Sequence, residues 1–136
     1  SEGVDIADKL LGKGTITYLQ DRDGKKEYYY SDAKSTDLPY VLLVNEGTAS
    51  TSEIVAAAIK DSKEGKLVGV TTFGKGIVQS TSQLADGDAL KLTIKQYFSP
   101  LGNTIHKIGV KPDYVVKDNT KTKTDEQLNK ALALLK

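Results

Sequence analysis

The sequence of 136 residues contains no cysteine, no methionine and a single histidine. The absence of cysteine excludes disulfides, thiolate metal sites and a cysteine nucleophile, and one histidine excludes a multi-histidine metal site within the chain. Position 1 is not methionine, so we expect a processed or shortened chain. The lack of a signal peptide or anchor in this sequence therefore says nothing about localisation. No apolar run approaches the ~20 residues that a membrane helix needs, so no membrane span is expected.

A strong charge of either sign is also lacking. The formal net charge is +1, and the basic residues are spread along the sequence. Such a balance argues against nucleic acid or an acidic membrane surface as a partner. With 38% apolar and 27% charged residues, the composition is that of one soluble domain with a modest core.

The middle of the chain has a strand–helix–strand pattern. "YVLLV" (40–44) is a short apolar run, typical of a strand buried on both faces. It is followed by an amphipathic segment, 51–65, that predicts a helix ended by Gly65, and then by a second buried strand, "KLVGVT" (66–71). We predict a βαβ unit with a right-handed crossover.

The flanking segments predict further elements of both kinds, which makes the fold class mixed α/β. Alternating residues around turn signals indicate two hairpins. The expected elements are a helix at 4–11, strands at 15–20 and 26–30, a polar loop at 31–39, a hairpin with strands before and after 85–88, a long loop at 99–113, a strand at "YVV" (114–116), a polar linker at 117–124 and a C-terminal helix at 125–136.

"GVTTFGKG" (69–76) places Lys75 between two glycines, in a pattern one residue short of a phosphate-binding loop. Such a loop needs Ser or Thr directly after the lysine and a helix behind it. Here Gly76 follows, and "IVQSTSQL" has the alternation of a strand. A nucleotide-binding domain is therefore the weakest interpretation, and an exposed lysine in a glycine-rich loop is more common.

Ser50 lies at the expected N-terminus of the central helix, where unpaired N–H groups favour negative charge. That position suits a nucleophile in acyl transfer, because the tetrahedral intermediate carries an oxyanion. The alternative is purely structural: Ser50 and Glu53 match a capping box. The G-x-S-x-G motif is absent, and a histidine triad would have to use His106, a lone loop histidine.

A serine can instead be activated by a lysine whose pKa is lowered by burial. Lys75 has apolar neighbours in sequence, and it follows the second predicted strand as Ser50 follows the first. Adjacent parallel strands would bring both residues to one carboxyl edge, where sites of α/β proteins usually form. Gln79 would share a face with Lys75 in an extended segment and could orient the amine.

Four segments together resemble a known family: "VNEGTASTSEI" (44–54), "TTFGKGIVQ" (71–79), "YFSPLGNTIHKIGVKPD" (97–113) and "DEQLNKAL" (125–132). They look like the protease domain of carboxyl-terminal processing proteases, also called tail-specific proteases, which are serine proteases of the Ser-Lys type. The resemblance covers almost the whole chain. It implies a crotonase-like α/β core with a mixed sheet, packed helices and hairpins, of which this chain is the carboxyl-terminal part.

The resemblance implies a role for each site residue. Ser50 would be the nucleophile, Lys75 the general base, Gln79 the residue that holds Lys75, and the backbone N–H of Thr51 one oxyanion-hole donor, where family members often have alanine. Glu53 would serve helix capping. The family's D-L-R-x-N-x-G-G segment, which is expected to supply the second oxyanion donor, and its PDZ domain are both missing from the sequence. Residues 1–116 would be the carboxyl-terminal part of the protease core, and residues 117–136 a polar linker and a C-terminal helix.

The function implied is a serine endopeptidase that cuts unfolded or tagged proteins near the carboxyl terminus. It would act on protein or peptide substrates without a metal or nucleotide cofactor, in an extracytoplasmic compartment such as periplasm, cell envelope or thylakoid lumen, or after secretion. Loss of one oxyanion donor costs about 3 kcal/mol, so we expect the fragment alone to have little activity. The alternative is a non-catalytic binding or scaffold module of the same fold, in which Ser50 is only an N-cap and Lys75 only a surface amine.

Overall fold

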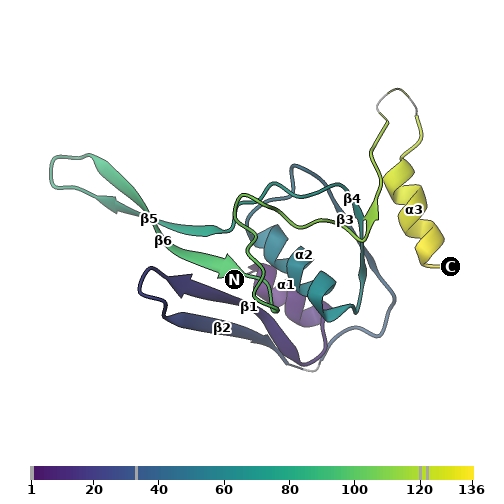
Figure 1. Cartoon of the computed structure of the whole chain (residues 1–136), viewed down its shortest axis with the longest axis horizontal. Coiled ribbons are helices and arrows are strands. Elements are labelled where there is room, and N and C mark those ends of the chain that lie inside the picture. The colour runs from purple at the N-terminus through teal and green to yellow at the C-terminus, as the bar shows by residue number, and fades with distance from the viewer. Residues whose placement is uncertain (1, 33, 120, 122) are drawn as a thin grey trace.

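A computed structural model describes residues 2–32, 34–119, 121 and 123–136. It contains helices α1 (Glu2–Leu10), α2 (Thr51–Ser62) and α3 (Glu126–Leu134). Its strands are β1 (Gly14–Asp21), β2 (Lys26–Ser31), β3 (Val41–Val44), β4 (Lys66–Gly69), β5 (Ile77–Gln83), β6 (Ala89–Phe98) and β7 (Tyr114–Val115). The mixed α/β fold is thus confirmed, with helices α1 and α2 side by side at its centre (Figure 1).

The strands form two sheets. One is antiparallel, with the order β2-β1-β6-β5, and contains both predicted hairpins. The other is parallel, with the order β3-β4-β7, and contains the predicted βαβ unit β3-α2-β4. In Figure 1 the β5–β6 hairpin extends far from the body, while α3 lies at the opposite end.

The core lies around α2. Its residues from Ile54 to Ile59 are all buried, which gives a broader apolar surface than the single face of the predicted amphipathic helix. Ala7 of α1, Ile16 of β1, Leu67 of β4 and Ile105 of the long loop complete it from four sides. Because both sheets and α1 pack on this one helix, its N-terminus is fixed relative to each of them.

Two local expectations were wrong. β3 is not buried on both faces: the side chain of Leu43 is 41% exposed. Within the described residues, β3 stands at the edge of its sheet, where fewer neighbours cover it. α2 ends at Ser62, and Lys63, rather than Gly65, adopts the left-handed conformation with φ 63°. Gly65 is required for another reason: a Cβ there would lie 2.3 Å from the ring of Tyr40.

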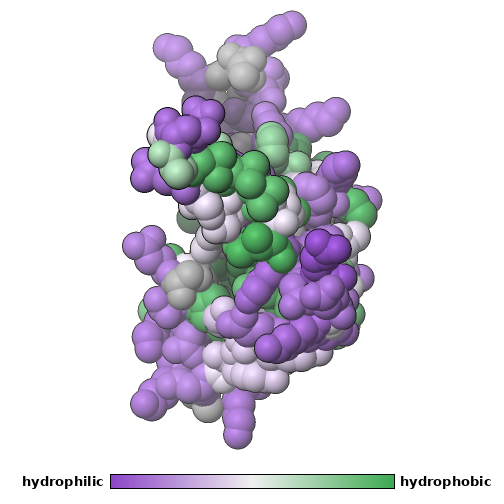
Figure 2. Space-filling view, turned by 90° about the vertical axis from the view of Figure 1, so that its left-hand side faces the viewer, coloured by the Kyte–Doolittle hydropathy of each residue, from purple (hydrophilic) through white to green (hydrophobic). Residues whose placement is uncertain are grey.

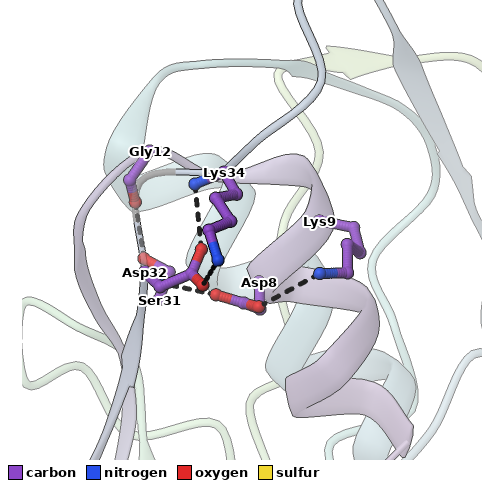
Figure 3. A network of polar contacts seen from close by, with 6 residues as sticks. All are labelled: Asp8, Lys9, Gly12, Ser31, Asp32 and Lys34. Carbon is purple, nitrogen blue, oxygen red and sulfur yellow. Dashed lines mark hydrogen bonds and ion pairs between the residues drawn. The ribbon is translucent and has the colours of Figure 1, made fainter.

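A polar network holds α1 against the end of β2 (Figure 3). The Ser31 hydroxyl donates to the carbonyl of Gly12 over 2.5 Å and accepts from the N–H of Gly14 over 3.0 Å. The Asp8 carboxylate accepts from the N–H of Asp32 over 2.6 Å. This network fixes α1, which forms one wall of the cavity described below.

Among the described residues, no helix is long and apolar enough to cross a membrane.

Candidate active site

Ser50 lies directly before α2, in the turn that follows β3. Its backbone has φ 58° and ψ −123°, a conformation that side-chain-bearing residues rarely adopt. Such a conformation costs about 1–3 kcal/mol and persists only where the surroundings impose it. The neighbouring Thr51 opens the helix, and its N–H is among the first amides, which have no intrahelical partner.

Thr51 also shows how closely α1 approaches the site. A Cβ built on Gly3 would lie 2.0 Å from the Thr51 methyl group, so only glycine fits at position 3. The larger side chain of threonine, compared with alanine, is therefore accommodated by a glycine on the facing helix.

Glu53 organises the site in a way that the capping prediction missed. Its side chain is fully buried, with 0% exposure. Oε2 accepts from the N–H of Ser50 over 3.0 Å, which is one half of the predicted capping box, and from the N–H of Lys75 over 2.8 Å. Oε1 accepts from the Thr72 hydroxyl over 2.5 Å and from the N–H of Gly74 over 2.7 Å. These four donors match the four acceptor sites of a carboxylate.

The two backbones are adjacent as a result. Since one carboxylate oxygen bonds both amides, the nitrogen atoms of Ser50 and Lys75 are separated by no more than the sum of two hydrogen-bond lengths. Ser50 follows β3 and Lys75 follows β4, and these strands are parallel neighbours, as predicted. The sheet thus delivers both residues to one edge, and Glu53 joins them there.

The segment around Lys75 is held from a second side by the long loop. The N–H of Lys107 donates to the carbonyl of Gly74 over 2.8 Å. Gly74 has φ 91°, and a Cβ on Gly76 would lie 2.5 Å from the backbone nitrogen of His106, so both positions require glycine. Lys75 is followed by strand β5 and not by a helix, which removes the feature that a phosphate-binding loop needs.

A cavity of about 580 Å³ joins the predicted site residues. It lies between the inner face of the antiparallel sheet and the N-termini of α1 and α2. Its lining includes Ser50, Thr51, Lys75, Gln79 and Tyr97, all four predicted site residues among them. Val4, Leu19, Ile54 and Val78 add apolar walls. The cavity is open, and Lys75 and Gln79 are exposed.

The expected burial of Lys75 differs from the structure, whereas the low weight given to His106 agrees with it. Burial of Lys75 beside apolar neighbours was wrong for this chain, because Phe73 is itself 67% exposed and Lys75 stands at the open side of the cavity. His106 is not among the residues that line this cavity. It lines a separate one with Gln96 and Phe98, so the structure does not bring it to Ser50.

Tyr97 of β6 is a further residue of the site that the sequence did not single out. It is 2% exposed, and its hydroxyl donates to the backbone carbonyl of Lys75. Burial, followed by the charge of Glu53, raises the pKa of the Tyr97 phenol well above its usual value, against an opposing hydrogen bond with the Ser50 side chain. Tyr97 lies within the third quoted segment, "YFSPLGNTIHKIGVKPD", but nothing in its local pattern signals a site residue.

The arrangement is a serine on a strained turn at a helix N-terminus, joined to a lysine loop by a buried carboxylate. Residues 1–116 match the model of peptidase family S41, and the chain therefore belongs to this peptidase family. It is 45% identical over 116 residues to the carboxyl-terminal-processing protease of Synechocystis and 44% identical over 113 residues to the chloroplastic C-terminal processing peptidase of Tetradesmus obliquus.

These alignments cover 85% and 82% of this chain but only 27% and 24% of the relatives, so the chain spans about a quarter of their length. Among solved structures, it is similar to a photosystem II D1 C-terminal processing protease, with a TM-score of 0.79 and 42% identity. That match covers 85% of this chain and 30% of the other. The predicted family and the fold of a partial protease domain are both confirmed.

Proposed function

We propose that this chain carries the nucleophile and the general base of a serine endopeptidase that processes the carboxyl-terminal region of proteins. Ser50 is the nucleophile, Lys75 the base, Gln79 the residue that orients the Lys75 amine, and the Thr51 N–H one oxyanion donor. The observation that carries the proposal is the bonding of Ser50 and Lys75 to one oxygen of Glu53, at the wall of a shared cavity.

The chemistry follows from these groups. The neutral Lys75 amine takes the hydroxyl proton as Ser50 Oγ bonds to the scissile carbonyl carbon, and the N–H groups at the start of α2 stabilise the oxyanion. The tetrahedral intermediate collapses, the C–N bond breaks, and the protonated Lys75 returns its proton to the leaving amine. Water then attacks the acyl-serine as Lys75 again accepts a proton, the ester bond to Ser50 Oγ breaks, the new carboxyl terminus leaves, and Lys75 returns the proton to Ser50.

A neutral amine at Lys75 requires a drier environment than its exposed position in this chain provides. The relatives are about four times longer than the matched region, and we propose that the remainder of the complete protein covers the open side of the cavity. The substrate is a polypeptide, because the relatives are named as carboxyl-terminal processing enzymes. We also propose a location outside the cytoplasm, in line with the chloroplastic relative.

The exposure of Lys75 favours one alternative of a different class. In it the complete protein is a non-catalytic scaffold, Ser50 serves only as the N-cap of α2, and Lys75 is a solvated amine. The two functions differ in whether Ser50 reacts, so a test on the residue itself separates them.

The test is proteolysis of an unfolded substrate such as casein by the complete protein that contains these residues. Ser50→Ala and Lys75→Ala should each lower kcat/KM by roughly 10⁴-fold or more while circular dichroism remains unchanged. Ser52→Ala and Lys66→Ala are matched controls on exposed residues that do not line the cavity, and we expect unaltered rates for both. Cleavage by the Ser50→Ala variant would refute the assignment of Ser50 as the nucleophile. Cleavage by Lys75→Ala, with Ser50→Ala inactive, would refute only the assignment of Lys75 as the base.

A further inference from the structure

Tyr97 is the one buried ionisable side chain, within the described part of the chain, that reaches the proposed pair from the antiparallel sheet. It stands near the end of β6, opposite Leu19 of β1. Its backbone N–H donates to the carbonyl of Gly76 over 3.1 Å, and its hydroxyl donates to the carbonyl of Lys75. Two consecutive carbonyls of the lysine loop are therefore bonded to a single residue of the sheet.

The contacts of Tyr97 complement those of Glu53. Glu53 fixes the N–H groups of Ser50 and Lys75 from the helix side. Tyr97 fixes the carbonyl of Lys75 from the sheet side, and it lines the same cavity as Ser50. Gly74 and Gly76 flank Lys75 and have no side chains with which to anchor the segment, so backbone hydrogen bonds such as those to Glu53 and Tyr97 hold the lysine in position.

The chemistry of the phenol suits this task. Its single proton is donated to the Lys75 carbonyl, so the phenol is oriented towards the lysine loop. Buried beside Glu53, the phenol stays protonated, so it adds no charge that would compete with the oxyanion.

We propose that Tyr97 is a positioning residue for the pair: its hydroxyl fixes the backbone of Lys75 beside Ser50, in the wall of the cavity that all three residues line. This inference rests on the proposed function of Ser50 and Lys75. It predicts that loss of the hydroxyl slows the chemical step without weakening substrate binding, because Tyr97 acts on the proposed base Lys75 and not on the substrate.

The experiment compares Tyr97→Phe with the unaltered complete protein in three measurements: the rate at which a fluorophosphonate probe labels Ser50, kcat and KM for a peptide substrate, and Tm. We expect labelling and kcat to fall by about 10- to 100-fold, since small displacements of reacting groups have effects of this size. KM should stay within about 2-fold, and Tm should fall by no more than about 4 °C, as expected for one lost hydrogen bond.

Tyr40→Phe is the matched control, because the Tyr40 hydroxyl also donates to a backbone carbonyl, that of Leu10 over 3.0 Å, away from the cavity lining. Its rates should equal those of the unaltered protein. Replacing Tyr97 with p-aminophenylalanine restores a donor and should recover most of the rate. If Tyr97→Phe does not fold, the p-aminophenylalanine variant decides the question by itself. Full activity of this folded variant supports the role of the hydrogen-bond donor, and a low rate of the folded variant contradicts it.

The outcomes separate the two proposals. Full labelling and full kcat in Tyr97→Phe, with Ser50→Ala and Lys75→Ala inactive, overturn the role of Tyr97 and leave the proposed function intact. If the rate of Tyr97→Phe falls only in proportion to the fraction of the protein that is unfolded, the role of Tyr97 is overturned as well. Failure of the probe to label Ser50 in the unaltered protein contradicts both proposals.

Discussion

Glu53 connects parts of the chain that are far apart in sequence. Its two oxygens bond donors from the turn before α2 and from residues 72–75, about 20 positions later. The Thr72 hydroxyl, which donates to Glu53, also accepts from the N–H of Val110 over 2.7 Å. A single buried carboxylate thus links the helix to the lysine loop directly and to the long loop through Thr72, and it bonds the N–H of the strained Ser50.

The substitution Glu53→Gln tests this role in the isolated chain. An amide keeps one acceptor oxygen and turns its NH₂ group towards two of the four donors, which are then buried without partners. We expect the free energy of unfolding to fall by about 2–4 kcal/mol, measured by urea denaturation. Glu46→Gln, at an exposed turn position before Ser50, is the control and should change it by less than about 0.5 kcal/mol. A stable Glu53→Gln variant would show that the four hydrogen bonds contribute little.

At the scale of elements, patterns of short range predicted the structure well. The βαβ unit was predicted because a strand buried in a parallel sheet and an amphipathic helix have distinct periodicities. Both hairpins were predicted from turn residues between alternating strands, and both are present. The exposure of Leu43 could not be predicted, because a continuous apolar run does not reveal whether its strand stands at the edge of a sheet.

In the candidate site, too, short-range patterns predicted some residues, whereas contacts between distant segments determined the others. Ser50, Thr51, Lys75 and Gln79 were selected from two segments whose order and spacing are specific, and the structure brings them to one cavity. Tyr97 and the bridging role of Glu53 were missed, because each depends on contacts across 20 or more positions, which no local pattern encodes. The exposure of Lys75 was missed since burial depends on what surrounds a loop and not on its neighbours in sequence.

An ion pair connects β2 to β6 across β1 and makes the stability of the antiparallel sheet depend on pH. Lys95 Nζ lies 2.6 Å from Glu27 Oε2. The hydrogen bond from Lys95, followed by one from Tyr29, lowers the pKa of Glu27, and the bond to Glu27 raises the pKa of Lys95. Since the folded pKa of Glu27 is lowered, its stabilisation is complete above the unfolded value and is lost as the pH falls through the folded one.

We therefore expect Glu27→Gln to lower the urea midpoint at pH 7, and the difference from the unaltered chain to shrink as the pH falls below about 4.5, the ordinary pKa of the carboxyl. Added salt should shrink it too, because both side chains are solvated. Urea titrations at several pH values measure both effects. A difference that stays constant down to pH 2 would contradict the assignment of the stabilisation to this ion pair.

The whole molecule has two contrasting faces on its projecting hairpin. Thr81 and Lys91 line the cavity on one face of the β5–β6 hairpin. Leu90, Leu92 and Ile94 alternate with the cavity-side residues and are 46%, 53% and 44% exposed. Figure 2, which looks onto the hairpin end, shows apolar side chains gathered between hydrophilic ones. An exposed apolar row on a sheet with an unpaired edge favours self-association.

The double substitution Leu90→Thr and Leu92→Thr should therefore raise the concentration at which the isolated chain begins to scatter light. Threonine suits a strand, and both positions are exposed, so we expect the urea midpoint to change little. Leu38→Thr serves as the control: Leu38 is 74% exposed but lies in the loop before β3, away from the row, and its replacement should leave the onset of scattering unchanged. Equal effects of the two changes would mean that total apolar exposure, and not the row on the hairpin, determines association. A large loss of stability in the double variant would mean that the leucines pack within the folded chain, and the hairpin would then be part of its core.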